Sequence, residues 1–363
     1  MLVGALVLAA ALVAPAGVVQ AQVAFTFADA RITESSGLAS SATGELLFTH
    51  NDSGDAARVY AVGGDGRTVA TYLLPGVEPR DWEDMARGPD EQGRSSLWLG
   101  DIGDNSAVRG EGIVVHRVLE PVPDGRVEVT TEAPTSFWLR YPDGPRDAEG
   151  LAVHPQTGRL YVVTKPLVGA AQVYAAPQPL DADGPNVLEL VGHVQPRATG
   201  TPGGPGIGAF AQLLVTAADI APDGSRFAVR TYTDVYEWDL DPAATGDVLR
   251  AALEAEPRVR SLPPVEQGEG LAYATDSASL LTSSEGQGAP VHRIPTAAVQ
   301  TGGRDQTAAP ETTAPGTNGP AATTPDEVAA SRLPLVAGAA GLVLLAVLVL
   351  RRPGRRTGRR RDG

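Results

Sequence analysis

A short motif recurs along the chain, each time just before a run in which apolar and polar positions alternate. Aligning on its apolar-Ala step gives five copies: ESSGLA at 34–39, DWEDMA at 81–86, DAEGLA at 147–152, TAADIA at 216–221 and QGEGLA at 267–272. Alternation with a period of two is the pattern of a β-strand. Recurrence of one motif at intervals of 47 to 69 residues indicates a repeat architecture.

Each motif is followed by further strand candidates. The second candidates are LLFTHNDSGD, LWLGDIGDN, LYVVTKP, FAVRTYTD and LLTSSEGQG, and the third are RVYAV, IVVHRV, AQVYAA, DVYEWDL and PVHRI. A fourth is visible in most copies, as in TVATYLL, SFWLRYP and VLELVGHV. Four short strands in each of five units predict an all-β fold, a five-bladed β-propeller. A β-sandwich or several small β domains are the competing folds.

Two segments do not fit the repeat. The fifth unit lacks a fourth strand, and QVAFTFADA at 22–30 is predicted to supply it and so close the ring. Closure would leave no open sheet edge. The segment DPAATGDVLRAALEAE at 241–256 is predicted to be helical and to lie outside the blade.

Each end of the chain contains a long apolar segment without the alternation of the strand candidates. Residues 1–21 look like a signal peptide with a Val-x-Ala site, although the absence of a basic start leaves a late start codon or an uncleaved anchor open. Residues 333–350 are 18 uncharged residues, about 27 Å of helix, and predict a transmembrane helix. A buried core helix is the alternative. The seven arginines in 351–363 place this tail on the cytoplasmic side.

The predicted domain organisation follows from these segments. After the signal peptide, a propeller domain at 22–298 is joined by a disordered stalk at 299–332, rich in Thr, Pro, Ala and Gly, to the membrane helix. O-glycosylation of the stalk is left open. The predicted location is the cell membrane, with a single pass, the propeller outside and the tail inside.

Charge and composition exclude several classes of function. The whole chain carries −14, and the +6 of the tail leaves −20 on the other 350 residues, so nucleic acid is not expected as a partner of the folded part. Without cysteine, disulfides and thiolate chemistry are excluded. Neither a Gly-x-Ser-x-Gly elbow nor the histidine spacing of a zinc site occurs.

Propeller geometry gathers the acidic motifs. In a four-stranded meander the entry to strand one and the exit of strand two lie on one face, so both polar sets should meet at one mouth of the channel. The candidate metal ligands are Glu34, Asp52, Asp81, Glu83, Asp101, Asp104, Asn105, Asp147, Glu149 and Glu269. Ca²⁺ takes six to eight oxygen ligands and would relieve the repulsion between these carboxylates. The alternative is a network of acids that only braces the loops.

The same mouth should carry candidate catalytic or anion-binding groups. They are His50, Lys165, Arg230, Tyr232 and Glu285. Lys165 is the one lysine of the chain, which suggests a need for a compact ammonium head. Together with a metal, these groups could hold a small anionic ligand. An incidental lysine, or a counter-ion for the channel carboxylates, is the alternative for Lys165.

The ordered motifs also carry a family resemblance. With ESSGLA, HNDSGD, DWEDMA, GDIGDN, RDAEGL, VVTK, VRTY and QGEG over about residues 30–295, the chain resembles a largely uncharacterised group of exported bacterial β-propellers, loosely called phytase-like or esterase-like. A more distant likeness, to five-bladed calcium-dependent apyrases, implies an acidic calcium site at the channel and phosphoester chemistry. No residue is transferred from those enzymes.

Two functions remain at this stage. The first is a membrane-anchored module that binds a protein, a glycan or a small anionic ligand at the acidic mouth, with Ca²⁺. The second is a metal-assisted hydrolase of phosphoesters or esters, with His50 or a carboxylate as base and Lys165 and Arg230 on the anion. Convergence of His50, Asp101, Lys165, Arg230 and Glu285 would favour the enzyme.

Overall fold

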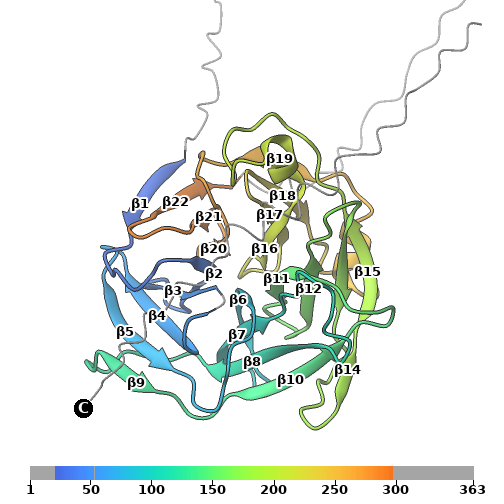
Figure 1. Ribbon diagram of the computed structural model, residues 1–363. Coiled ribbons are helices and arrows are strands. Elements are labelled where there is room, and N and C mark those ends of the chain that lie inside the picture. Colours follow the sequence, from blue (N-terminus) through green and yellow to red (C-terminus); the bar gives the residue numbers. More distant parts are fainter. Residues whose placement is uncertain (1–20, 53, 297–363) are drawn as a thin grey trace, which may run out of the picture. The chain divides into compact units, whose positions relative to one another are not determined.

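Five sheets surround a common axis in the computed structural model, which describes residues 21–52 and 54–296 (Figure 1). The all-β fold and the five blades predicted from the repeat are confirmed. The predicted stalk, transmembrane helix and tail, and all but Ala21 of the predicted signal peptide, lie outside the described residues. Within the described residues, no helix has the length and apolar character needed to span a bilayer.

The strands of each blade follow one another from the axis outward (Figure 1). Blade 1 contains β2 (Ser35–Ser40), β3 (Leu46–Asn51), β4 (Arg58–Gly63) and β5 (Thr68–Leu73). Blade 2 contains β6 (Trp82–Pro89), β7 (Ser95–Asp101), β8 (Ile113–Leu119) and β10 (Thr135–Arg140). Blade 3 contains β11 (Ala148–Val153), β12 (Leu160–Thr164), β13 (Ala171–Ala175) and β15 (Glu189–Val194). Blade 4 contains β16 (Val215–Ile220), β17 (Arg226–Thr231), β18 (Asp234–Asp239) and β19 (Arg258–Ser261). Blade 5 contains β20 (Leu271–Tyr273), β21 (Ser279–Thr282), β22 (Pro290–Pro295) and β1 (Gln22–Thr26).

The ring closes as predicted, because β1 pairs antiparallel with β22 as the fourth strand of blade 5. Within the segment 241–256, which was predicted to be helical, the α-helix is only α1 (Val248–Ala252), between β18 and β19. Asp247 caps it by accepting hydrogen bonds from the backbone N–H groups of Leu249 and Arg250. A 3₁₀ helix, η1 (Gly208–Leu213), precedes β16.

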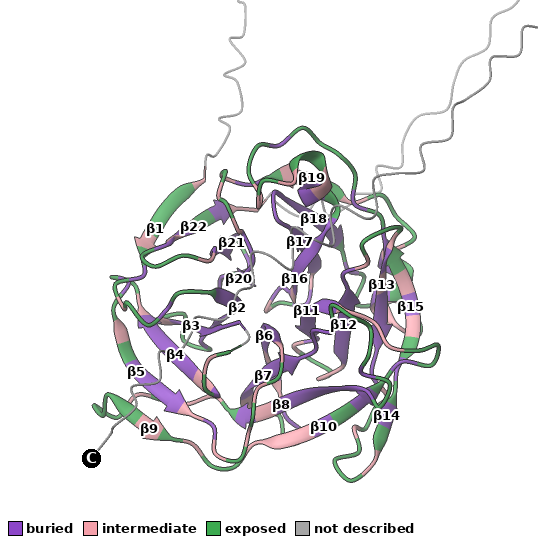
Figure 2. Cartoon of the chain, viewed as in Figure 1, coloured by how far each residue is buried: buried purple, intermediate pink, exposed green. Residues whose placement is uncertain are grey.

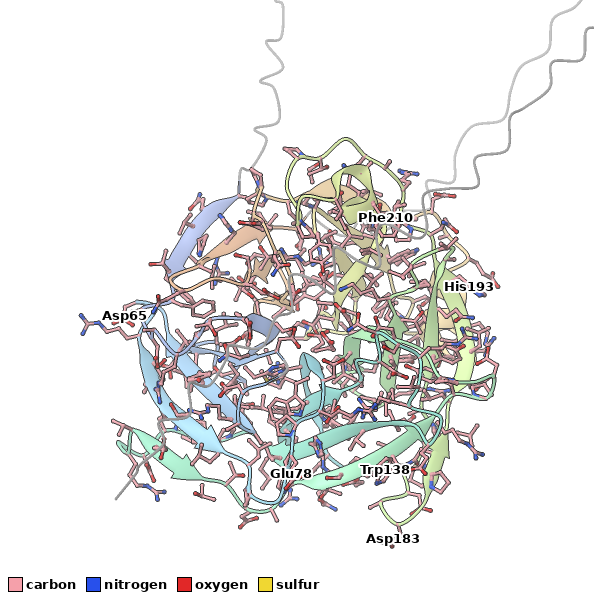
Figure 3. All side chains as sticks on the ribbon, viewed as in Figure 1. Asp65, Glu78, Trp138, Asp183, His193 and Phe210 are labelled. Carbon is pink, nitrogen blue, oxygen red and sulfur yellow. The ribbon has the colours of Figure 1, made fainter. Side chains whose placement is uncertain are left out.

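Two short strands were not predicted. Both β9 (Glu128–Thr130) and β14 (Pro185–Val187) leave their own blade between its third and fourth strands and pair, in parallel, with the outer strand of the preceding blade, β5 and β10 respectively. In blade 4 the same connection contains α1, which contacts β15 of blade 3. Outer strands are exposed edges, and these segments cover three of them. Trp138 of β10 and Asp183, just before β14, lie at this rim (Figure 3).

The hydrophobic core lies between blades. Each of the five large buried clusters joins the facing sheets of two neighbouring blades. The inner strands therefore have both faces buried, and the burial decreases toward the rim (Figure 2). The central opening between the ribbons of Figure 1 is filled with side chains in Figure 3.

Candidate metal centre at the channel mouth

The repeated motif forms a β-bulge. In four blades the pairing of the first and second strands shifts register at this point: between Ser35 and Leu38, Trp82 and Met85, Ala148 and Gly150, and Val215 and Ala217. A bulge bends the strand and changes the direction of a side chain. Glu83 and Glu149 lie within two of these bulges. The motif was expected to precede the first strand, and this was wrong for blades 1 to 4, where most of the motif belongs to that strand.

Two sets of carboxylates come together as the sequence predicted for the mouth. One set is Asp52, Asp81 and Glu83, and the other is Asp52, Glu269 and Glu285. Within each set, one oxygen of every residue lies within 4.8 Å of the others. Glu285, predicted as a catalytic group, lies among these acids and is therefore also a candidate ligand. The sets come from blades 1, 2 and 5 and share Asp52.

The glutamates of the repeat are buried. Glu83 and Glu149 are 1% exposed and Glu269 is 5% exposed. Burial raises the pKa of Glu83 well above its ordinary value, and the charges of Glu149, Asp52 and Asp81 raise it further. Burial also raises the pKa of Glu269, with contributions from Glu285 and Asp52. Each of the three glutamates has one oxygen (Oε1, Oε1 and Oε2, respectively) without a hydrogen-bond partner among the described residues.

Lys165 is the buried cation of this centre. Its Nζ lies 2.5 Å from Oε2 of Glu149 and 3.1 Å from the hydroxyl of Tyr232, and the side chain is 8% exposed. Burial lowers the pKa of Lys165, but the charges of Glu149, Tyr232 and Glu269 outweigh burial and raise it well above the ordinary value. The lysine is therefore charged. These contacts favour the interpretation of Lys165 as a counter-ion for channel carboxylates.

Arg230 braces blade 5. Its Nη1 donates hydrogen bonds to the carbonyl oxygens of Gly270 at 2.5 Å and Ser283 at 2.7 Å. Burial lowers the pKa of Arg230 to about 9, a loss partly offset by the charge of Glu269. A Cβ atom at Gly268 would lie 2.2 Å from Nη2 of Arg230, so the backbone of blade 5 closes directly over the guanidinium group.

The acids of the GDIGDN segment hold loops. Asp101 accepts hydrogen bonds from the backbone N–H groups of Arg80 and Asp81 and forms an ion pair of 2.7 Å with Arg109. In the same loop, the carboxylate of Asp104 accepts hydrogen bonds from the N–H groups of Val108 and Arg109. The N–H group of Asp104 donates a hydrogen bond to the carboxylate of Asp147. Asn105 is exposed. These contacts favour loop support over metal ligation for Asp101, Asp104 and Asp147.

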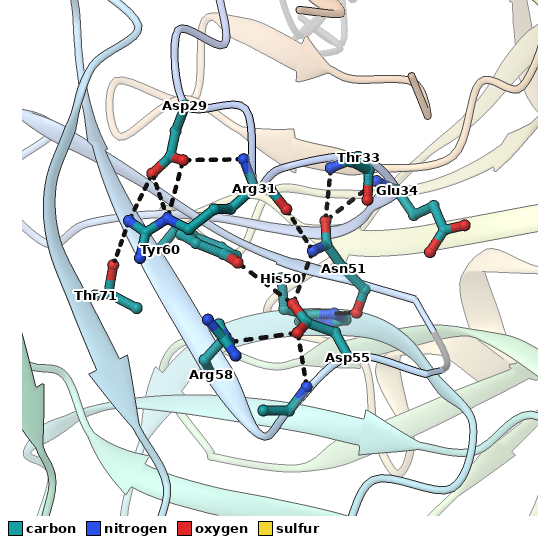
Figure 4. Close-up of polar contacts among 11 residues, drawn as sticks. Asp29, Arg31, Thr33, Glu34, His50, Asn51, Asp55, Arg58, Tyr60 and Thr71 are labelled. Atoms are coloured by element: carbon teal, nitrogen blue, oxygen red, sulfur yellow. Dashed lines mark hydrogen bonds and ion pairs between the residues drawn. The ribbon is translucent and has the colours of Figure 1, made fainter. Parts of the chain in front are cut away.

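Asn51 organises the neighbouring loop of blade 1 (Figure 4). Its Oδ1 accepts hydrogen bonds from the N–H groups of Thr33 and Glu34, and its Nδ2 donates to Asp55. Glu34 itself is exposed, and its backbone forms a β-bridge with Glu285. This bridge ties blade 5 to blade 1 beside Asp52.

His50 lies in the core beneath the mouth. Its ring has no exposed surface, packs edge-on against Trp82 at 5.1 Å, and its Nδ1 lies 2.9 Å from the carbonyl oxygen of Asn51. Burial lowers the pKa of His50, so the imidazole is neutral. His50 lies in the core, Asp101 is paired with Arg109, and Arg230 donates to backbone carbonyl oxygens. These contacts do not show the convergence of side chains that would favour an enzyme.

Two aspartates, the buried Asp84 and the half-buried Asp219, connect blades in a way that the sequence did not reveal. Oδ2 of Asp84 accepts hydrogen bonds from the N–H groups of Leu151 in blade 3 and Ala218 in blade 4, at 2.9 and 3.0 Å. Oδ2 of Asp219 accepts a hydrogen bond from Tyr273 N–H in blade 5, at 2.7 Å. Both acids occupy one repeat position, at which the other three blades have glycine. The alternation of glycine and aspartate at this repeat position is visible in the sequence and could have indicated the role of the two aspartates.

Comparison with known proteins gives no family. No protein-family model and no curated protein matches the chain. Solved structures that resemble it include a gluconolactonase from Xanthomonas campestris, with 14% identity, a TM-score of 0.40, and coverage of 73% of this chain and 87% of that chain. U3-55K has 13% identity and a TM-score of 0.32, with coverage of 72% of this chain and 68% of that chain. A chain of the nidogen/laminin complex has 11% identity and a TM-score of 0.37, with coverage of 70% of this chain and 73% of that chain. Such likenesses are too distant to inform the chemistry of the site. By its own strand topology, the described part of the chain is a five-bladed β-propeller.

Proposed function

We propose that this protein is a membrane-anchored, extracytoplasmic β-propeller that binds a ligand or partner at its acidic channel mouth through bound Ca²⁺. The observation that carries the proposal is that carboxylates from three blades meet in two groups of three, each at distances suited to a cation: Asp52, Asp81 and Glu83, and Asp52, Glu269 and Glu285. Lys165 is paired with Glu149 at 2.5 Å, and a divalent ion would stabilise the ionised form of the other carboxylates.

The ligand chemistry favours a hard divalent ion. Every residue in the two sets offers a carboxylate oxygen, and Ca²⁺ prefers oxygen ligands in a flexible arrangement. Zinc sites are built mainly from cysteine and histidine, and neither occurs in these sets. Because Ca²⁺ takes six to eight ligands, coordination positions would be left for water and for an external ligand.

Anchoring and export rest on the sequence. The apolar segment 333–350, followed by seven arginines, supports a single membrane pass, and residues 1–21 support export. The propeller would then project from the outer surface of the membrane on its stalk. A surface protein or glycan, or a small anionic molecule, is the expected partner.

A hydrolase acting on phosphoesters or esters is the second candidate. One observation favours it: the charged Lys165, hydrogen-bonded to Tyr232, is electrostatically linked to Glu83 and Glu269. An anionic substrate could therefore contact both a metal and a protein cation. The core position of His50 leaves a carboxylate as the candidate base.

Thermal unfolding tests the calcium proposal. The full chain, purified in mild detergent, is unfolded with EDTA and then with added CaCl₂. A rise in the unfolding midpoint with Ca²⁺ is expected, because an ion that binds only the folded state stabilises it. The rise should disappear in Asp52→Asn and persist in Glu132→Gln, a control at an exposed acid. No rise at millimolar Ca²⁺ in the wild type would contradict the proposal.

A further inference from the structure

We infer that the mouth holds two cations rather than one, and that Asp52 bridges them. The inference rests on the proposed function, since it concerns the number of ions at the same site. Its basis is that the carboxylates form two separate sets with a single common member, Asp52. Asp81 and Glu83 would complete the first ion site, and Glu269 and Glu285 the second.

The first site lies between blades 1 and 2. A Cβ atom placed on Gly103 would be 2.3 Å from Oε1 of Glu83 and 2.5 Å from Oδ2 of Asp81. The two oxygens therefore border the same small space, next to a residue without a side chain. Oε1 of Glu83 is the buried oxygen that has no hydrogen-bond partner among the described residues. An ion in this space would supply the missing partner.

The second site lies between blades 5 and 1. The carbonyl oxygen of Glu34 accepts a hydrogen bond of 2.9 Å from Asp52 N–H, and Glu34 forms the β-bridge with Glu285. This backbone arrangement brings Asp52 and Glu285 to adjacent positions. Gln267 donates a hydrogen bond to Oε2 of Glu285 and so orients it. Oε2 of Glu269, which is nine-tenths buried, has no hydrogen-bond partner within the part of the chain that is described.

A single ion cannot satisfy both sets. A buried polar oxygen without a partner is costly, and each set contains one such oxygen among the described residues, on Glu83 and on Glu269. Five carboxylates with one divalent ion would keep an excess of negative charge, and the nearby lysine is already paired with Glu149. A carboxylate has two oxygens, so Asp52 can offer one to each ion. Such a pair of ions would select an oxyanion ligand, such as a phosphate ester or a carboxylate.

Counting the bound ions tests the inference. CaCl₂ is titrated into the metal-stripped full chain in detergent by isothermal calorimetry, for the wild type and four variants. Asp81→Asn removes a ligand of the first site only, and Glu285→Gln removes a ligand of the second site only. Asp52→Asn removes a ligand that both sites share. Glu132→Gln is the control at an exposed acid. Circular dichroism in EDTA establishes that each variant is folded.

The expected stoichiometry is two ions in the wild type and the control, and one in Asp81→Asn and in Glu285→Gln. Asp52→Asn should weaken both ions, and the two other single variants decide the matter if it does not fold. One ion in the wild type would overturn the two-ion inference while leaving the calcium proposal intact. Loss of all binding in either Asp81→Asn or Glu285→Gln would also overturn it. No binding to the wild type would overturn both.

Discussion

At the scale of single residues, equivalent positions of the repeat have different roles. Glu83, Glu149 and Glu269 occupy one repeat position. Glu149 has a lysine at 2.5 Å, whereas Glu83 and Glu269 belong to sets of carboxylates around Asp52. Lys165 directly follows β12, the second strand of the blade that contains Glu149, whereas Asp52 directly follows β3, the second strand of blade 1. The residue after the second strand therefore decides whether a glutamate of the repeat has a cation or another carboxylate beside it.

Removal of the Lys165 side chain should leave the buried carboxylate of Glu149 without its cation. Lys165→Met is expected to lower the free energy of unfolding by about 3 kcal/mol, because Glu149 loses its partner in a buried site. The double variant Lys165→Met/Glu149→Gln should recover part of this loss. Urea unfolding in EDTA measures both. Additive losses in the double variant would show that the two side chains do not depend on each other.

The pH dependence of stability can be assigned partly to Asp219. Burial raises the pKa of Asp219 from 3.8 to about 7, although hydrogen bonds from Tyr273 and Ile220 N–H act in the opposite direction. The folded state then binds a proton more tightly than the unfolded state, so this stabilising contribution is present at low pH and is lost as the pH rises from about 4 to 7. Asparagine cannot titrate. Asp219→Asn should therefore cost less stability at pH 8 than at pH 5, as measured by urea unfolding in EDTA. A cost that is the same at both pH values would mean that the carboxyl group is ionised throughout.

At the scale of elements, the inner strands are fitted to each other by an alternation of aspartate and glycine. Asp84 and Asp219 connect neighbouring blades through backbone N–H groups, and glycine occurs where the next blade is too close for any side chain. At Gly270, a Cβ atom would lie 2.6 Å from the carbonyl oxygen of Ser36 in blade 1. The repeat motif is therefore a packing device as well as a source of acids.

Gly270→Ala should disturb the junction of blades 5 and 1. The added methyl group meets backbone, which cannot move away easily, and a loss of about 1–3 kcal/mol in the free energy of unfolding is expected. Gly64→Ala is the matched control, because a Cβ atom there meets nothing within 4 Å. Chemical denaturation of both variants gives the comparison. Equal effects would rule out the close approach at Gly270 as the cause.

At the scale of the whole molecule, the ring depends on a strand from the other end of the chain. β1 pairs with β22, and Phe25 packs against the core between blades 5 and 1. The connections that contain β9, β14 and α1 cover the outer strands of blades 1, 2 and 3. Blade 5 instead obtains its outer strand from β1. Stability is thus shared among five interfaces of similar kind.

Deletion of β1 should open the ring. A chain that begins at Phe27 is expected to have a lower unfolding midpoint than one that begins at Gln22, because β22 loses its partner strand. The newly exposed edge should also promote association. Calorimetry and light scattering on the two chains measure these effects. An unchanged midpoint would show that β1 contributes little to closure.

Much of the fold could be predicted because each blade repeats the same local pattern. Alternating apolar positions and glycine turns identified the second and third strands of every blade and all the fourth strands except β19, including β1 as the closing strand. The first strands were expected to follow the repeated motif, whereas in blades 1 to 4 they contain most of it. The strands β9 and β14 could not be predicted, since each has only three residues and most of their side chains are exposed. Their pairing is decided by a neighbouring blade, and no local pattern records it.

The sequence by itself determined the five-fold repeat, the acidic character of one channel mouth and the strand that closes the ring, because periodicity, charge and turn residues are local properties. The tertiary structure alone decided which acids meet. Asp101 and Asp104 hold loops, Asp219 connects blades, and Glu285 joins Asp52 and Glu269. The role of a carboxylate depends on the donors, cations and other carboxylates within a few ångströms of it. In a propeller those neighbours come from other blades, far apart in the chain.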